Sequence, residues 1–227
     1  MYQLAHRGYS DYFPENTMSA FRYAFDTDFD GIETDVQQTK DGRLVLLHDY
    51  KINRTSTGKG LLKDWLYHDL LKLKFSGKMK MNTTIPSLEE LLCEAKESGK
   101  IVNLEIKSDV LEGTAEKTVQ MVKDMGVEKQ VYYSSVNPEH LMTIKKLDPN
   151  AYCAMITERN YKQAKQLVID HHFEGLHARV KELTDDEIKD LKARGIAIGA
   201  WTVKSQKDFD RLKKHDITFV FTNTYFE

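Results

Sequence analysis

Short apolar segments alternate with longer helical segments along almost the whole chain. Apolar and β-branched residues predict nine strands, at residues 2–5, 31–37, 44–47, 101–106, 130–134, 152–156, 173–178, 196–203 and 218–222. Capping residues and helical periodicity predict helices at 14–25, 87–98, 111–125, 138–147, 160–171, 185–194 and 206–214. Asn16 or Thr17 is the expected cap of the first helix. Strands that alternate with helices in this way form a parallel sheet covered by helices.

One pair of predicted strands cannot be parallel. Residues 31–37 and 44–47 are separated by Asp41-Gly42, a preferred two-residue hairpin turn, which leaves no room for a crossover helix. The eight strands that remain alternate with helices and predict a TIM (β/α)8 barrel, with a final helix that is short or absent after residue 222. An open doubly wound sheet is the alternative, but it usually shows a glycine-rich phosphate loop after a strand, and the sequence has none.

Composition limits the classes of protein that this chain can be. It has 33 basic and 35 acidic residues, a formal charge of -2 at pH 7, so no overall field favours nucleic acid. No stretch approaches the length of a membrane span, and we expect a soluble, cytoplasmic protein. Cys93 and Cys153 lack the spacing of a metal site and are expected to be free, partly buried thiols.

Polar residues gather where the first predicted strands end. The first strand delivers His6-Arg7, the second carries Glu33 and Asp35, and a later strand carries Glu105, with Lys107 two residues on. Because side chains alternate along a strand, Glu33 and Asp35 are expected on the same face. In TIM barrels such strand ends form the active site, so we expect these side chains to converge.

The return strand of the hairpin adds His48. With Lys40 opposite Arg43, the ladder places His48 opposite Asp35, beside the acids. An ordinary surface hairpin with solvated charges is the alternative, but it needs no acids on the face shared with a histidine. We therefore favour a catalytic metal centre in this part of the chain.

Three carboxylates packed together would repel one another unless a cation lay between them. A hard divalent ion such as Mg²⁺ or Ca²⁺ suits an all-oxygen ligand set, which disfavours zinc. Two histidines beside it can act as acid and base, and Arg7 and Lys107 suit a phosphate group. Taken alone, Glu105 and Lys107 would more often be an ion pair inside the barrel. The whole set indicates phosphoryl chemistry.

Eight stretches of the chain carry a family resemblance. They are His6-Arg7-Gly8, Pro14-Glu15-Asn16-Thr17, Glu33-Thr34-Asp35-Val36, His48-Asp49, Arg54-Thr55-Ser56-Thr57-Gly58, Ile85-Pro86-Ser87-Leu88, Glu105-Ile106-Lys107 and Trp201-Thr202-Val203. In this order they resemble the motifs of glycerophosphodiester phosphodiesterases, over nearly the whole chain. The resemblance implies hydrolysis of a glycerophosphodiester to glycerol 3-phosphate and an alcohol.

The resemblance also implies roles for single residues. It gives Glu33, Asp35 and Glu105 as the ligands of one divalent cation, Mg²⁺ or Ca²⁺, and His6 and His48 as acid and base. It further implies that the glycerol 2-hydroxyl attacks phosphorus to give a cyclic phosphate, which water then opens.

Three substrate contacts follow from the same resemblance. Arg7 and Lys107 would contact phosphate, and Trp201 would form a wall against glycerol, although a tryptophan in a barrel strand is more often part of the core. Two residues depart from the pattern. Lys204 stands where the family usually has Asn, and Asn223 stands where Asp is common.

The family's insertion over the barrel mouth corresponds to residues 51–85 of a single catalytic domain spanning 1–227. Within it, Leu61, Leu62, Trp65, Leu66, Leu70, Leu71, Leu73 and Phe75 alternate with Lys63, Lys72, Lys74, Lys78 and Lys80. One interpretation is a lid whose apolar side packs on the rim with its lysines in water. The other is a basic, apolar edge that meets a lipid surface as a peripheral membrane contact.

His177 lies near the end of its predicted strand and could face the pocket, but we favour a structural histidine with its hydrogen bonds satisfied. Two alternative functions stay open. One is a related barrel phosphodiesterase acting on lysophospholipid or sphingomyelin head groups, and the other is a binding protein of the same fold without turnover. In the favoured reading the partner is a small-molecule glycerophosphodiester and not nucleic acid; the sequence leaves the oligomeric state open.

Overall fold

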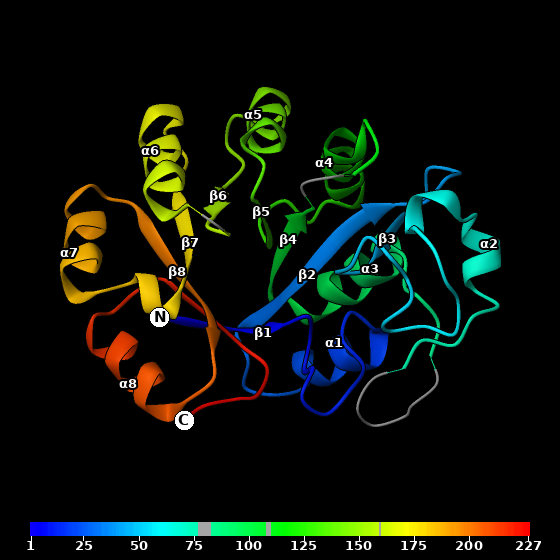
Figure 1. Cartoon of the computed structure of the whole chain (residues 1–227), viewed down its shortest axis with the longest axis horizontal. Coiled ribbons are helices and arrows are strands. Elements are labelled where there is room, and N and C mark those ends of the chain that lie inside the picture. Colours follow the sequence, from blue (N-terminus) through cyan, green and yellow to red (C-terminus); the bar gives the residue numbers. More distant parts are fainter. Residues whose placement is uncertain (77–82, 108–109, 159) are drawn as a thin grey trace.

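Eight parallel strands close into a barrel in the computed structural model, which describes residues 1–76, 83–107, 110–158 and 160–227 (Figure 1). The strands are β1 (Tyr2–His6), β2 (Gly31–Gln38), β4 (Ile101–Ile106), β5 (Val131–Ser135), β6 (Cys153–Ile156), β7 (Gly175–Arg179), β8 (Ala197–Val203) and β9 (Phe219–Thr222), with β3 (Leu44–Leu46) antiparallel on β2. β1 pairs with both β2 and β9, which closes the ring. The predicted TIM barrel is confirmed.

In the described part of the chain, seven helices surround the barrel (Figure 1). They are α1 (Met18–Phe25), α3 (Leu88–Ser98), α4 (Thr114–Met125), α5 (Pro138–Leu147), α6 (Tyr161–His171), α7 (Asp185–Ala193) and α8 (Gln206–Lys214). Every parallel strand except β9 is followed by one of them, and the described residues after β9 contain no helix. The expectation of a short or absent final helix is therefore met.

The first helix begins after Thr17, one of the two capping residues that the sequence suggests. Thr17 caps α1, and its hydroxyl accepts a hydrogen bond from the backbone of Ala20. Asn16 has a φ of 53°, which a right-handed helix cannot include, so residues 14–16 form a turn before the helix. The capping box predicted at Ser87 and Glu90 is present in α3.

Apolar side chains fill two parts of the barrel. A large cluster packs between the strands and the surrounding helices, where Phe21, Leu91 and Leu104 are fully buried. A smaller cluster lies inside the ring and contains Leu4, Tyr132, Phe219 and Phe221, with Trp201 packed against it. The inner cluster supplies an apolar wall to the cavity described below.

The hairpin between β2 and β3 has a loop of three residues, where the sequence predicts two. Gln38 pairs with Leu44, and Gly42 ends the loop with a φ of 84°. Three-residue hairpins commonly place glycine at this left-handed position. The predicted two-residue Asp41-Gly42 turn is wrong, because Lys40 also belongs to the loop.

The pairing of β2 with β3 is consequently shifted by one residue. The backbone N–H of Leu47 donates to the carbonyl of Asp35 at 3.0 Å, so Leu47, and not His48 as predicted, lies opposite Asp35. In a regular ladder this shift would turn His48 to the other face of the sheet. However, β3 ends at Leu46, and the chain leaves the ladder before His48, which still lines the cavity.

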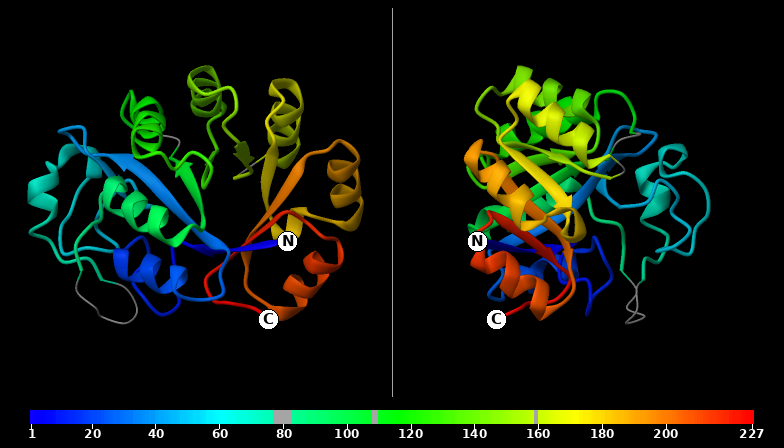
Figure 2. Two further views of the ribbon diagram at one scale, coloured as in Figure 1. Left: turned by 180° about the vertical axis from the view of Figure 1, so that it is seen from behind. Right: turned by 60° about the vertical axis from the view of Figure 1, so that its left-hand side comes forward.

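The described part of the predicted insertion, residues 51–76 and 83–85, lies at one side of the barrel (Figure 2). It contains a 3₁₀ turn (Leu62–Asp64) and the short helix α2 (Tyr67–Leu70), and it contributes to a hydrophobic cluster separate from that of the barrel. The members of this cluster are Val45, Leu47, Ile52, Leu62, Leu70, Phe75 and Ile85. These described residues thus pack together with the hairpin.

The apolar residues of the insertion do not all face inward. Leu66 and Leu71 are 37% and 41% exposed, while Leu70 is fully buried. Lys72 and Lys74 are exposed, and Lys78 and Lys80 lie outside the described residues. Among the helices of the described residues, none combines the length and apolarity needed to cross a membrane.

The two cysteines are free and differ in exposure. Cys93 is exposed on α3, and Cys153 is fully buried in β6. The expectation that both are partly buried is wrong. Burial raises the pKa of the Cys153 thiol to about 12.

Candidate active site

Three carboxylates from the neighbouring strands β2 and β4 lie close together. β2 and β4 pair in a register that sets Asp35 beside Glu105, and β1 sets His6 beside Glu33. One oxygen from each of Glu33, Asp35 and Glu105 lies within 4.8 Å of the others. The predicted convergence of these acids is confirmed, since residues two apart on β2 share a face.

The cluster has an electrostatic cost that a cation would remove. Burial, reinforced by the neighbouring carboxylates, raises the pKa of both Glu33 and Glu105 above the usual range. Glu33 is 5% exposed, so water cannot screen it well. Three oxygen donors this close together fit a hard divalent cation, and the cluster can bind one.

Asp35 differs from the other two acids. Burial would raise its pKa, but Lys107 and Arg7 outweigh that effect and hold the pKa below its usual range. Lys107 Nζ lies 3.3 Å from Asp35 Oδ1 and 2.6 Å from Glu105 Oε1. The ion pair of Glu105 and Lys107, which the sequence favours only for these two residues taken alone, is present within the larger cluster.

Asn16, one of the two expected caps of the first helix, is instead a buried member of the site. Its side-chain amide donates to Asp35 Oδ2 at 2.8 Å, and its carbonyl oxygen accepts from the Thr34 hydroxyl at 2.7 Å. These bonds fix the orientation of the Asp35 carboxylate. The sequence feature that could have pointed to Asn16 is the polar stretch Pro14-Glu15-Asn16-Thr17. However, the separation of this stretch from Asp35 in the sequence does not predict a contact between them.

Arg7 follows β1 directly and turns its side chain into the site. Its φ of 60° is left-handed, and its backbone N–H donates to Glu33 Oε2 at 3.0 Å. Its guanidinium pairs with Glu15 at 2.9 Å and lies 3.6 Å from Asp35. Arg7 and Lys107 thus place two fixed positive charges around the acids.

His6 is held by the last strand of the barrel. Its Nδ1 atom lies 2.9 Å from Oδ1 of Asn223, which follows β9. Burial, and then the charge of Arg7, lower the pKa of His6 to about 4, while the bond to Asn223 acts in the opposite direction. His6 Nε2, 3.9 Å from Glu33 Oε2, is the nitrogen that faces the carboxylates.

His48 has a carboxylate partner instead. Its Nδ1 atom lies 2.7 Å from Asp49 Oδ1. A carboxylate accepts and does not donate, so Nδ1 carries a proton and Nε2 is left for other chemistry. Burial would raise the pKa of Asp49, but hydrogen bonds from Arg54 and His48 outweigh it and hold the pKa at about 2.

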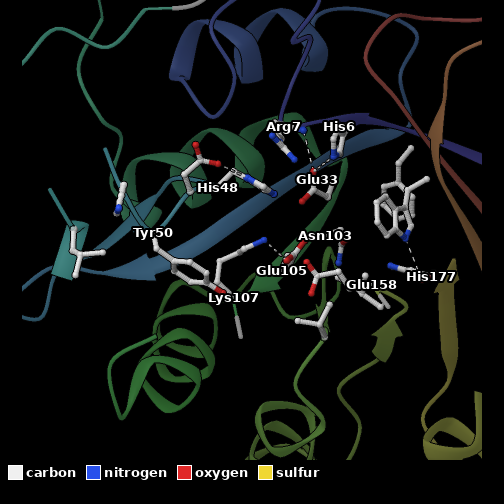
Figure 3. Close-up of a pocket in the computed structure, with 17 residues that line it drawn as sticks. His6, Arg7, Glu33, His48, Tyr50, Asn103, Glu105, Lys107, Glu158 and His177 are labelled. Carbon is white, nitrogen blue, oxygen red and sulfur yellow. Dashed lines mark hydrogen bonds and ion pairs between the residues drawn. The ribbon is translucent and has the colours of Figure 1, made fainter. Parts of the chain in front are cut away.

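These groups surround one cavity of about 610 Å³ (Figure 3). His6, Arg7 and Glu33 lie together, and Lys107 is directed toward Glu105. Apolar side chains also line the cavity, among them Leu61, Val136, Ile156, Trp201 and Phe221. The cavity therefore combines charged groups with an apolar lining.

Trp201 and His177 line the cavity from neighbouring strands. Trp201 is half-buried, and its indole N–H donates to the carbonyl of His177 at 3.2 Å. His177 is 2% exposed, and its Nε2 has no hydrogen-bond partner among the described residues. The expectation of a satisfied histidine is wrong. Burial lowers the pKa of His177 to about 3, so the ring is neutral.

Gly199 leaves the space that the His177 ring occupies. A Cβ at position 199 would lie 2.4 Å from Cδ2 of His177 and 2.9 Å from Phe221. Only glycine allows so close an approach. By contrast, Lys204, one of the two unusual residues, is exposed and is not among the described residues that line the cavity.

Comparison with known proteins assigns these features to one family. A family model described as the glycerophosphoryl diester phosphodiesterase family matches residues 6–225. A Bacillus altitudinis glycerophosphodiester phosphodiesterase is 34% identical, with 97% of this chain and 93% of that protein covered. A protein of the same name from Caldanaerobacter subterraneus is 32% identical with the same coverage.

Solved structures agree. An Oleispira antarctica phosphodiesterase in complex with the product sn-glycerol-3-phosphate has a TM-score of 0.89 and 25% identity, with 98% of this chain and 93% of that chain covered. A Thermotoga maritima glycerophosphodiester phosphodiesterase has a TM-score of 0.80, with 97% of this chain and 93% of that chain covered; at 23% identity it supports the fold alone.

Proposed function

The chain belongs to the glycerophosphoryl diester phosphodiesterase family, and from this premise we propose that it hydrolyses glycerophosphodiesters to glycerol 3-phosphate and an alcohol with the help of a divalent cation. One observation carries the proposal. The carboxylates of Glu33, Asp35 and Glu105 lie within 4.8 Å of one another in the same cavity as His6 and His48. The chain is thus an enzyme of the phosphoric diester hydrolase class.

Glu33, Asp35 and Glu105 would hold the cation, either Mg²⁺ or Ca²⁺. All three offer carboxylate oxygens, which both ions prefer, and their burial explains why a charge is needed there. Bound there, the cation would offset the negative charge of the phosphodiester and increase the acidity of a nearby hydroxyl.

Arg7 and Lys107 would hold the phosphate group. Arg7 offers a planar fork and Lys107 a point charge, and both are kept in place by the acids beside them. Trp201 would form the wall against glycerol, since its indole is part of the cavity lining. The charged groups would then receive the phosphate, and the apolar lining would receive the carbon skeleton.

His6 and His48 would move the protons. Each uses Nδ1 for a neighbour, Asn223 or Asp49, so Nε2 is the atom that exchanges protons with substrate. In the first step one imidazole takes the proton of the glycerol 2-hydroxyl as its oxygen bonds to phosphorus. The other imidazole donates a proton to the leaving alcohol as its bond to phosphorus breaks.

Water then opens the cyclic phosphate, and the same two nitrogens act in reverse. An internal nucleophile avoids the entropy of recruiting a second reactant, an advantage of up to roughly 7 to 11 kcal/mol in well-oriented cases. This route requires the 2-hydroxyl. A substrate without it should bind normally and turn over orders of magnitude more slowly, and a normal rate would show direct attack by water.

The test of the function is a substrate screen. Glycerophosphocholine, glycerophosphoethanolamine and glycerophosphoglycerol are incubated with the protein and Mg²⁺ or Ca²⁺, and release of glycerol 3-phosphate is measured. We expect release from at least one of them. If none is hydrolysed while the protein is folded and binds the metal, a binding protein of the same fold becomes the better description.

A second candidate is action on lysophospholipids or sphingomyelin head groups. The observation that favours it is the number of apolar side chains in the cavity lining, which include Leu61 of the insertion and Phe221 of β9 and could receive more carbon than glycerol. Lysophosphatidylcholine and sphingomyelin belong in the same screen for that reason. The exposed Leu66 and Leu71, near Lys72 and Lys74, would then face a lipid surface.

A further inference from the structure

We propose that Arg54 is a positioning residue that sets His48 and Arg7 in place relative to each other, acting through Asp49 and Glu15. The inference rests on the proposed function, because it assigns His48 to proton transfer and Arg7 to phosphate. Arg54 itself does not line the cavity, whereas His48, Asp49 and Arg7 do. It belongs to the insertion, so the proposal gives that segment a part in the chemistry.

Arg54 grips two acids at once. Its Nε lies 2.6 Å from Asp49 Oδ2 and its Nη2 lies 3.0 Å from Asp49 Oδ1. On the other side, Nη1 lies 2.7 Å from Glu15 Oε2 and Nη2 lies 2.7 Å from Glu15 Oε1. The planar guanidinium therefore makes a two-bond fork to each carboxylate and fixes the angle between them.

Each of these two acids also forms a hydrogen bond with a residue that lines the cavity. Asp49 Oδ1 also accepts from His48 Nδ1 at 2.7 Å, and Glu15 Oε1 also accepts from Arg7 Nη1 at 2.9 Å. These are the same two oxygens that Arg54 Nη2 contacts. Arg54 Nη2 is therefore connected to the His48 imidazole through one Asp49 oxygen, and to the Arg7 guanidinium through one Glu15 oxygen.

The network joins three separate parts of the chain. Glu15 lies between β1 and α1, Asp49 follows β3, and Arg54 lies in the insertion. The Arg54 side chain is 47% exposed and Asp49 is 29% exposed, and exposed ion pairs contribute little to folding. A network this well directed but poorly buried is better explained by orientation than by stability.

Lysine could not replace Arg54. An ammonium is a point charge with freely rotating donors, so it cannot hold two carboxylates in one plane. Arg54→Lys should keep the positive charge but lose the fixed angle between the Asp49 and Glu15 carboxylates. Arg54→Gln removes both the charge and the fixed angle.

Arg22→Gln is the matched control. Arg22 contacts Glu94 through two nitrogens on the outer helices, away from the cavity.

The experiment measures kcat and KM on the preferred glycerophosphodiester in the presence of the metal. We expect Arg54→Gln to lower kcat by up to about 10²-fold, the scale of a displacement of about 1 Å, and Arg54→Lys to recover little of it. Arg22→Gln should behave as the wild type. Full activity in Arg54→Gln would overturn the proposal. If Arg54→Gln fails to fold, Arg54→Lys carries the same comparison.

A double-mutant cycle separates positioning from a general structural effect. If Arg54 acts on His48 through Asp49, the loss of kcat in Arg54→Gln combined with Asp49→Asn should be smaller than the product of the single losses. Independent, multiplicative losses would show that Arg54 does not act through Asp49, which contradicts the proposal.

Two readouts do not require turnover. Inorganic phosphate should bind several-fold more weakly to Arg54→Gln than to the wild type, because Arg7 loses its fixed orientation. The NMR signal of the His48 Nδ1 proton should shift or broaden in the same variant. Should the wild type hydrolyse no glycerophosphodiester, the proposed function fails, yet these two measurements still decide the role of Arg54. Unchanged phosphate affinity together with an unchanged His48 signal would overturn it.

Discussion

The imidazole of His6 and the side-chain amide of Asn223 meet at 2.9 Å, which links the first strand of the barrel to the end of the last. Asn223 stands where an aspartate is common in the family that the sequence resembles, so the partner of this histidine is neutral. The consequence is electrostatic. An amide can orient the ring without supplying the negative charge that would favour the imidazolium.

Substitution of Asn223 should move the pH dependence of the rate in a direction that depends on the new side chain. The pKa of His6 is lowered to about 4 by burial and by Arg7. Asn223→Asp adds a negative charge that stabilises the protonated ring, so the limb of the pH–rate profile governed by His6 should move to higher pH. Asn223→Ala removes a hydrogen bond that raises the pKa, so the same limb should move to lower pH. Profiles of kcat/KM test this, and shifts in one common direction would contradict it.

Metal binding and proton transfer should respond to different substitutions. Asp35→Asn should weaken binding of Mg²⁺ or Ca²⁺, measured by calorimetry, and lower the rate, and exhaustive chelation should abolish turnover. His48→Ala should leave metal affinity unchanged and lower kcat by roughly 10²- to 10⁴-fold, the usual scale of acid or base catalysis. Equal loss of metal in both variants would make His48 a ligand instead.

A large-to-small substitution in the hydrophobic cluster of the insertion should destabilise the insertion without unfolding the barrel. Leu70 is fully buried in a hydrophobic cluster separate from that of the barrel, whereas its neighbour Leu71 is 41% exposed. Leu70→Ala should destabilise the insertion by about 2 to 5 kcal/mol, as large-to-small core changes do, and Leu71→Ala should have little effect. Hydrogen exchange would show faster exchange in residues 51–85 of Leu70→Ala, with the barrel strands still protected. If the strands lose protection equally, the insertion is part of the barrel's core.

The two cysteines should report folding by their reactivity. Cys93 is exposed on α3 and should react with a thiol reagent at once in the native protein. Cys153 is fully buried and burial raises its pKa to about 12, so it should react only when the barrel opens. Labelling followed by mass spectrometry at increasing denaturant would measure this. Immediate labelling of both thiols in native buffer would contradict the placement of Cys153.

Periodicity was sufficient to predict the barrel and the carboxylate cluster. The strand period of two places Glu33 and Asp35 on one face, and barrel topology brings Glu105 to them. The hairpin register was predicted incorrectly because it depends on whether Gly42 ends a loop of two residues or three. Short sequences do not distinguish these two loops.

Contacts made over long sequence separations could not be predicted in the same way. Asn16 reaches Asp35, and Arg54 reaches Glu15, 39 residues away. Neither pair has a spacing that a helix or hairpin would impose. The same holds for His177. The strand pattern predicts which face of the sheet carries its side chain, but it does not predict whether Nε2 has a hydrogen-bond partner.

The pairing of β1 with β9 joins the first strand of the barrel to the last, so the barrel can close only when synthesis of the chain is nearly finished. The acids lie on β2 and β4, which leave the ribosome early, while β9 and Asn223 are made last. At roughly 5 to 20 residues per second, synthesis of the intervening chain takes on the order of 10 s. During that interval the nascent chain carries the acidic strands without β9 and without Asn223, the hydrogen-bond partner of His6, so the cluster around His6 cannot be complete before the end of the chain is made.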